Sequence, residues 1–228
     1  MASQNPHIMK WGLRLLLLSA PCWWIGAFGF LRVVGAVYDA QDSAAQLSII
    51  GKHPIAWQAQ NLCFLCGVLA TCGGLVTLTA MLHETWARRF AVGGLVTTLI
   101  ATVLGIGVVY RALNVHAWLM ATSPPMYSGA GTNPLHTMFG VLTLVGFIGY
   151  GLALVSLQPL RWTGVVAIVL STGMLVQVAQ RHDAFPPLFF YTVPFMFGVR
   201  LLFRHAEGER IGAAHVREGA VSKWSRRA

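Results

Sequence analysis

Six apolar runs, separated by short polar stretches, dominate the pattern of hydrophobic and polar positions along the chain. An α-helix that crosses the hydrocarbon core of a bilayer needs about 20 apolar residues. All six runs approach that length, and four of them contain no charged residue. The pattern therefore predicts an all-α fold, a polytopic transmembrane helix bundle of about six spans. The predicted spans are approximately Leu13–Val37, Leu62–Leu82, Phe90–Tyr110, Thr137–Ser156, Gly164–Ala179 and Phe185–Phe203.

The polar stretches predict how the spans are connected. An amphipathic segment over Ala45–Ile50 precedes Pro54, which we expect to end it. Short connections at His83–Arg89 and Leu157–Trp162 make the spans on either side antiparallel neighbours. We expect residues 1–205 to form one transmembrane domain. Residues 206–228 form a basic cytoplasmic tail, which we expect to be disordered beside anionic lipid headgroups.

Composition agrees with a membrane protein. Only 10% of the 228 residues are charged, against about 25% in a soluble domain. The net charge of +9 comes from Lys and Arg residues that flank the apolar runs, so it does not indicate nucleic-acid binding. With six spans, twelve of the 16 Lys and Arg residues fall on the side of the two termini and four on the other side. The positive-inside rule then predicts a protein of the cell (plasma or inner) membrane with both termini in the cytoplasm.

Small residues predict where the helices meet. Lipid supplies no hydrophobic drive for helix association, so close backbone approach through Gly, Ala and Thr takes that role. The predicted contact positions are Gly67, Ala70, Thr71 and Gly74 in the second span, Gly93, Gly94, Gly105 and Gly107 in the third, and Gly146, Gly149 and Gly151 in the fourth.

The first candidate chemistry is a metal site on the outer side. His116, His136 and His182 come from separate outer segments, and Asp183 follows the last of them. Imidazole and carboxylate groups suit zinc, copper or iron. No two of these histidines have a local ligand spacing such as HxxxH, so interfacial histidines that bond to backbone or headgroups are the alternative.

The second candidate is a thiol pair, Cys63 and Cys66, in a CxxC at the predicted outer end of the second span. At the N-terminus of a helix such a pair can have a stabilised thiolate and form a reversible disulfide. The position resembles that of the CxxC in the quinone-linked disulfide-forming membrane oxidoreductases. Those enzymes carry a second cysteine pair in an outer loop, and residues 111–136 of this chain contain no cysteine. Two buried free cysteines are the alternative.

The third candidate is acid catalysis by Asp39, Asp42 or Asp183. Asp39 and Asp42 form a DxxD, which resembles the magnesium-binding aspartate motif of membrane prenyltransferases. A carboxylic acid in an apolar pocket could instead protonate an alkene. In size and aromatic content the chain resembles membrane-bound terpene cyclases, with Trp and Phe side chains lining a cation-stabilising pocket. A helix cap for the aspartates and an interfacial belt for the aromatics are the alternatives.

Two classes of function stay open at this point. The preferred one is a multi-pass protein without catalytic activity that packs against a membrane-protein partner or binds a lipophilic small molecule between its helices. The other is a small membrane enzyme with an outward-facing crevice, which is metal-dependent, redox-active or acid-catalysed. Membrane lipids are expected partners in both cases, and the sequence assigns no cofactor.

Overall fold

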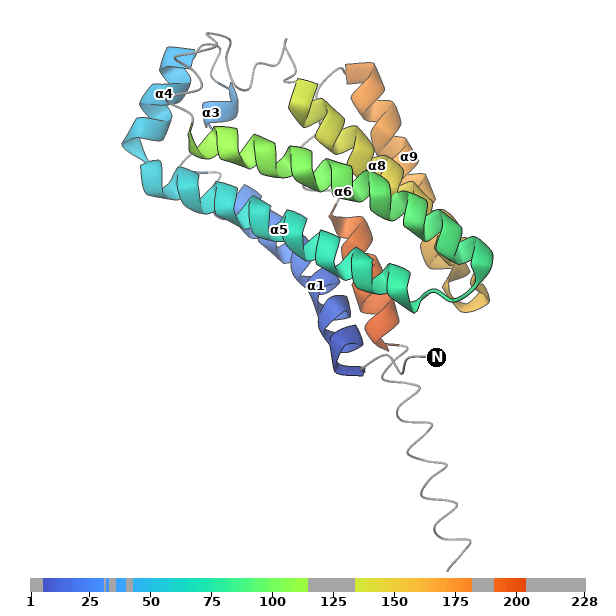
Figure 1. The fold of residues 1–228 in the computed structure, drawn as a ribbon. Coiled ribbons are helices and arrows are strands. Elements are labelled where there is room, and N and C mark those ends of the chain that lie inside the picture. The colour runs from blue at the N-terminus through green and yellow to red at the C-terminus, as the bar shows by residue number, and fades with distance from the viewer. Residues whose placement is uncertain are drawn as a thin grey trace, which may run out of the picture.

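The described part of the protein is a bundle of helices (Figure 1). The computed structural model describes residues 6–30, 32, 36–39, 43–114, 134–181 and 191–203. Within these residues every regular element is a helix and no strand occurs, which confirms the all-α prediction. Five of the helices are long and apolar enough to cross a membrane: Lys10–Gly29, Pro54–Met81, Thr85–Leu113, Pro134–Val155 and Arg161–Gln180.

The helices follow one another with short connections wherever both neighbours are described. The labelled elements are α1 (Pro6–Trp24), the π-helix η1 (Ile25–Gly29), α3 (Ala36–Asp39), α4 (Ser43–Lys52), α5 (Pro54–Met81), α6 (Thr85–Leu113), α8 (Pro134–Val155), the 3-10 helix η2 (Gln158–Leu160) and α9 (Arg161–Arg181). A last apolar helix, Thr192–Phe203, follows.

The described residues contain five candidate spans instead of about six, because the helix in the region of the sixth is too short to be one. Its 12 residues extend about 18 Å, less than the roughly 30 Å of a hydrocarbon core. The residues before 191 that were predicted to belong to it lie outside the described residues, as does the basic tail.

The first two spans have different bounds from those predicted. The first ends near Gly29 instead of Val37. Pro21 lies inside α1 and has no backbone N–H to donate, and a π-helical turn over Ile25–Gly29 follows it. The second begins at Pro54, eight residues earlier than predicted. Proline suits the first turn of a helix because the N–H that it lacks has no partner there. The preceding helix α4 ends at Lys52, before Pro54 as predicted, and Pro54 also starts α5, which was not predicted.

The order of packing follows the order of the chain, and the last helix closes it. α5 packs against α1 and α6, and α8 packs against α6 and α9. The last helix contacts both α1 and α8. Gly198 lies against Leu16 and Leu17 of α1, and the Phe197 ring centroid lies 6.5 Å from that of Tyr150 in α8. We call the end of the bundle where α5 begins the α4 end, and the end where α5 turns into α6 the His83 end (Figure 1).

Glycines bring α6 and α8 into close contact. A Cβ atom on Gly94 would lie 2.7 Å from the Gly146 carbonyl oxygen, and one on Gly149 would lie 2.9 Å from the Gly94 Cα. The predicted role of Gly94, Gly146 and Gly149 in helix contacts is therefore confirmed. The prediction was wrong for Gly93, whose Cβ would meet nothing within 4 Å.

A buried hydroxyl pair connects α8 to α5. The Tyr150 Oη lies 3.0 Å from the Leu75 carbonyl oxygen and 2.6 Å from the Thr79 Oγ1, which itself lies 2.9 Å from that carbonyl. Two hydroxyl protons serve these three contacts, so two hydrogen bonds form at any one time. The pair satisfies two polar groups that would be costly to leave without partners in an apolar interior.

The close contact at Gly94 can be tested by comparing substitutions of Gly94 and of its neighbour Gly93. Gly94→Ala should lower the free energy of unfolding in detergent by about 1–3 kcal/mol, since the added methyl group meets backbone. Gly93→Ala is the matched control and should be neutral or stabilising by up to about 1 kcal/mol, because alanine restricts the unfolded chain. Equal effects of the two substitutions would contradict the close approach of α6 and α8.

The Tyr150 hydroxyl can be tested by Tyr150→Phe. Loss of the interhelical hydrogen bonds should destabilise the protein by about 0.6–1.7 kcal/mol, the range for such bonds in membrane proteins. Tyr110→Phe is the control, because Tyr110 is exposed on α6. Denaturant titration in detergent measures both variants, and a Tyr150→Phe protein as stable as the control would be evidence against this bridge.

Candidate functional site

Four of the eight predicted site residues lie in the described part of the chain. Asp39 is the last residue of α3, Cys63 and Cys66 lie in α5, and His136 lies in the first turn of α8. The described residues contain no group of three or more His, Cys, Asp and Glu side chains that could hold a metal ion. The metal and acid hypotheses stay predictions, because four of their residues lie outside the described part: Asp42, His116, His182 and Asp183.

The CxxC was predicted to lie at the start of a helix, but it lies well inside one. Because α5 begins at Pro54, Cys63 is its tenth residue. The favourable field of a helix N-terminus acts only within the first turn, so it does not reach these thiols. Cys63 is half-buried and Cys66 is exposed, and both are free.

A third thiol, which sequence reasoning missed, lies close to this pair. α1 and α5 are antiparallel neighbours, with Gly26 facing Cys63 and with the Ser19 carbonyl facing Gly67. Cys22 lies between Ser19 and Gly26 on the same face of α1, which places it beside the CxxC and within electrostatic reach of Cys66 and Cys63. The 40 residues between Cys22 and Cys63 hide this proximity in the sequence.

The α4 end holds an unusual group of buried amides. Gln46 of α4 and the adjacent Gln60 and Asn61 of α5 are all buried. Asn61 Nδ2 donates to the Trp57 carbonyl oxygen at 2.9 Å. Gln60 is only 1% exposed, and its Oε1 has no hydrogen-bond partner among the described residues. Such a group costs about 1–3 kcal/mol of desolvation unless something donates to it, so it marks a place where a partner is missing.

Aromatic side chains lie one turn before and one turn after Gln60 on α5. Trp57, one turn earlier in α5, donates from Nε1 to the Ala112 carbonyl oxygen at 2.7 Å and so joins the start of α5 to the end of α6. Its ring packs in a small core with Val37, Ile50 and Ala112. One turn later, Phe64 stacks on Trp23 with ring centroids 4.5 Å apart, and Trp23 stacks on Tyr191 at 4.4 Å.

His136 reaches a similar depth in the bundle. α5 and α8 run in the same direction and meet where Tyr150 contacts Leu75. Gln60 precedes Leu75 by 15 residues and His136 precedes Tyr150 by 14, so both lie at the α4 end. Next to His136, the buried Thr137 Oγ1 also has no hydrogen-bond partner in the part of the chain that the structure describes. Within that part, polar atoms without partners therefore occur in both helices at this end.

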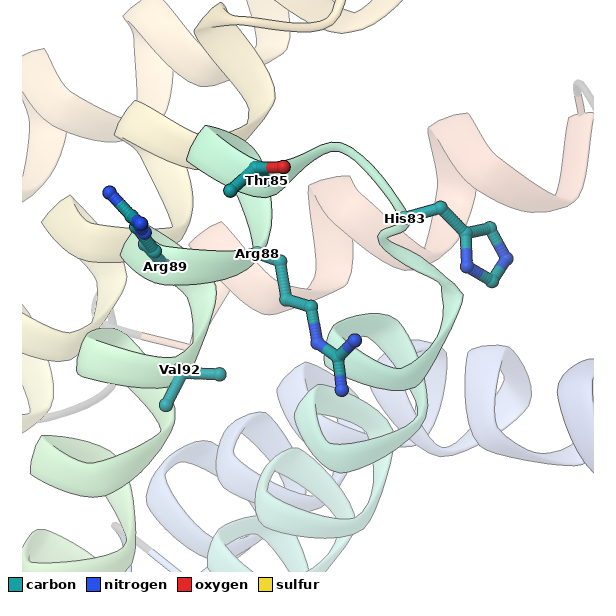
Figure 2. Close-up of a pocket in the computed structure, with 5 residues that line it drawn as sticks. All are labelled: His83, Thr85, Arg88, Arg89 and Val92. Carbon is teal, nitrogen blue, oxygen red and sulfur yellow. The ribbon is translucent and has the colours of Figure 1, made fainter.

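The His83 end carries an open pocket of about 400 Å³ at the turn between α5 and α6. Its lining residues are His83, Thr85, Arg88, Arg89 and Val92, shown in Figure 2. Arg88 and Arg89 leave the first turns of α6 in different directions, and His83 points away from both (Figure 2). The positive groups thus spread around the hollow instead of converging on one point.

The acidic residue beside this pocket does not neutralise it. Glu84 lies four residues before Arg88, a spacing that allows an ion pair across one helical turn, but no such pair is present among the described side chains. Instead, Arg88 N donates to the Glu84 carbonyl oxygen at 2.8 Å, and the Glu84 side chain makes no capping hydrogen bond. The Arg89 guanidinium lies 5.2 Å from the centre of the Trp86 ring. The sequence pattern assigned no function to these residues, because spacing alone does not show a pocket.

Comparison of the chain with models of protein families, with curated proteins and with solved structures finds no match in any of the three.

The thiols should differ in reactivity. Exposed Cys66 should react with N-ethylmaleimide before half-buried Cys63 in protein purified in mild detergent, and peptide mass spectrometry at successive times reads the order. Slower labelling of Cys66 than of Cys63 would contradict the position of the pair on α5. The same assay after treatment with a soluble quinone tests the redox hypothesis, which requires that oxidation protects the thiols from labelling.

Proposed function

We propose that the protein is a multi-pass protein of the cell membrane that binds a lipophilic small molecule at the α4 end of its helix bundle. In this proposal both termini are cytoplasmic, the His83 end faces the cytoplasm and the α4 end faces outward. The ligand has an apolar body and, at one end, a hydroxyl or N–H group that donates a hydrogen bond.

The observation that carries this proposal is the buried Oε1 of Gln60. Native proteins leave few buried polar atoms without a partner. In a helix surrounded by lipid and apolar side chains, water does not readily supply the missing donor. A donor on the ligand would satisfy the Gln60 Oε1.

The side chains around Gln60 suit an apolar ligand body. Trp57 and Phe64 lie one turn on either side of it, and Phe64 belongs to the stack with Trp23 and Tyr191. Ligand sites are typically apolar with a few polar groups that set orientation. A long-chain alcohol, a quinol or another amphiphile of that class has the chemistry that this end of the bundle would recognise.

The charge pattern supports the proposed orientation. Arg88 and Arg89 lie at the His83 end, and Arg161 begins α9 after the other connection at that end. The positive-inside rule places such residues in the cytoplasm. The apolar faces of α6 and α9 that are exposed in the isolated chain would then contact lipid acyl chains or a membrane-protein partner.

Redox chemistry is the second candidate function, because the structure groups Cys22 with Cys63 and Cys66. Oxidation of two of these thiols to a disulfide would release two protons and two electrons. A membrane quinone is the class of acceptor that would take both and become a quinol. The exposed position of Cys66 on the lipid side of α5 is compatible with such an acceptor.

Ligand binding can be tested by replacing Gln60. Wild-type protein purified in mild detergent should retain a lipophile that organic extraction and mass spectrometry detect. Gln60→Leu should reduce its amount about tenfold, because one hydrogen bond of about 1.4 kcal/mol is lost. Gln58→Leu is the matched control, since Gln58 is exposed on the same helix. A Gln60→Leu variant that retains as much lipophile as the control would refute the proposal.

The orientation can be tested by cysteine labelling in intact cells. A membrane-impermeant maleimide should label Lys52→Cys, at the α4 end, without permeabilisation. It should label Arg161→Cys, at the His83 end, only after the membrane is opened. The unmodified chain, whose cysteines all lie in α1 and α5, gives the background signal. The reversed pattern would place the termini outside.

A further inference from the structure

The pocket at the His83 end has the features of a binding site for an anionic headgroup. Two guanidinium groups, an imidazole and a hydroxyl line it, with one apolar side chain, Val92. Arginine binds phosphate through two parallel N–H donors and stays charged at every physiological pH. Neither Arg88 nor Arg89 forms an ion pair among the described residues, and Arg89 instead lies over Trp86, so both charges remain available to an anion.

We infer that this pocket binds the phosphate group of an anionic membrane lipid. The inference rests on the proposed function only in that it needs the His83 end to lie at the cytoplasmic surface of the membrane. It adds a second ligand, at the opposite end of the bundle from Gln60 and with opposite chemistry.

The position of the pocket along the helices supports a lipid as the source of the phosphate. The pocket lies at the turn between two membrane-length helices, where the hydrocarbon core ends and headgroups begin. Trp86, beside it, is 65% exposed, and tryptophan is enriched at that boundary. A headgroup at this depth meets the arginines without leaving its own layer.

The acyl chains of a bound lipid need no groove of their own, because a stripe of exposed apolar side chains on α6 begins at the pocket. Val92 lines the pocket, and further exposed apolar side chains follow it at helical spacings of four, three and four residues. These are Val96, Leu99 and Val103. Residues so spaced share one face of a helix. A lipid with its phosphate at Arg88 would therefore have its chains along this face.

The spread of the basic groups around the pocket favours a headgroup over a small ion. The separation of the basic side chains seen in Figure 2 suits a phosphate with attached glycerol or other polar groups more than a bare anion held at one point.

The inference can be tested in lipid nanodiscs. Wild-type protein is reconstituted in nanodiscs that contain equal amounts of phosphatidylglycerol and phosphatidylcholine, and native mass spectrometry after release counts the lipids that stay bound. Phosphatidylglycerol should be retained in preference to phosphatidylcholine. In Arg88→Gln/Arg89→Gln this preference should fall by about tenfold, since each arginine near an anionic surface contributes attraction.

The control is Arg161→Gln, which removes an arginine that begins a helix at the same end but does not line the pocket. It should keep the wild-type preference. Equal retention of both lipids by wild type, or equal loss in the control and the double variant, would overturn the inference. Thermal unfolding in detergent checks that the variants are folded, and the single variants Arg88→Gln and Arg89→Gln replace the double variant if it is not.

A second arm separates the two sources of phosphate. Millimolar inorganic phosphate is added before release. Retention of phosphatidylglycerol despite it supports the lipid as the ligand, whereas displacement at matched ionic strength would overturn the lipid assignment in favour of a soluble phosphate compound. Neither arm involves Gln60 or the direction of insertion, so a failure here is distinguishable from a failure of the proposed function.

Discussion

Close approach of helix backbones through small residues is the constraint on which the bundle depends. A helix in lipid gains nothing from hiding leucine against another helix, so association rests on dispersion and on polar contacts between helices. In α6 and α8 the backbones meet at Gly94, Gly146 and Gly149. The same device recurs where Trp23 of α1 lies against Gly67 of α5, and where the last helix places Gly198 against α1. Each contact depends on the absence of a side chain.

Many polar side chains inside the bundle follow a second rule: they hydrogen-bond to groups close to them in the same helix. The hydroxyls of Thr71, Thr98, Thr102 and Thr143 donate to the carbonyl oxygen one turn earlier in the same helix. Tyr150 and Thr79 extend the rule across two helices. Among the described residues four buried polar atoms depart from it, and these are Trp23 Nε1, Gln60 Oε1, Thr137 Oγ1 and Ser171 Oγ. Departures from local consistency tend to occur at functional positions, and the Gln60 amide is the one on which the proposed ligand site is built.

Hydropathy predicted the helices well because length and apolarity are properties of the segment itself. The bounds were less accurate where one residue has opposite meanings in different contexts. Pro54 can end one helix or begin the next, and only the position of α5 decides between them. The sequence alone could not predict that segments far apart in the chain lie side by side, as those with Cys22 and Cys63 do. The pocket around Arg88 was missed for a related reason: an Arg-Arg pair after a span looks the same in sequence whether the side chains line a hollow or lie in water.

The short helix Thr192–Phe203 has a consequence for biogenesis. For the membrane protein proposed above, helices α1, α5 and α6 would pair as each leaves the translocon, because their partners are neighbours in the chain. Leu16 must wait for Gly198, 182 residues later, and Trp23 must wait for Tyr191. Until translation has reached that point, one side of α1 faces lipid or a chaperone. The last helix therefore completes the bundle. A nascent chain that stopped after α9 would present an incomplete aromatic stack to membrane quality control.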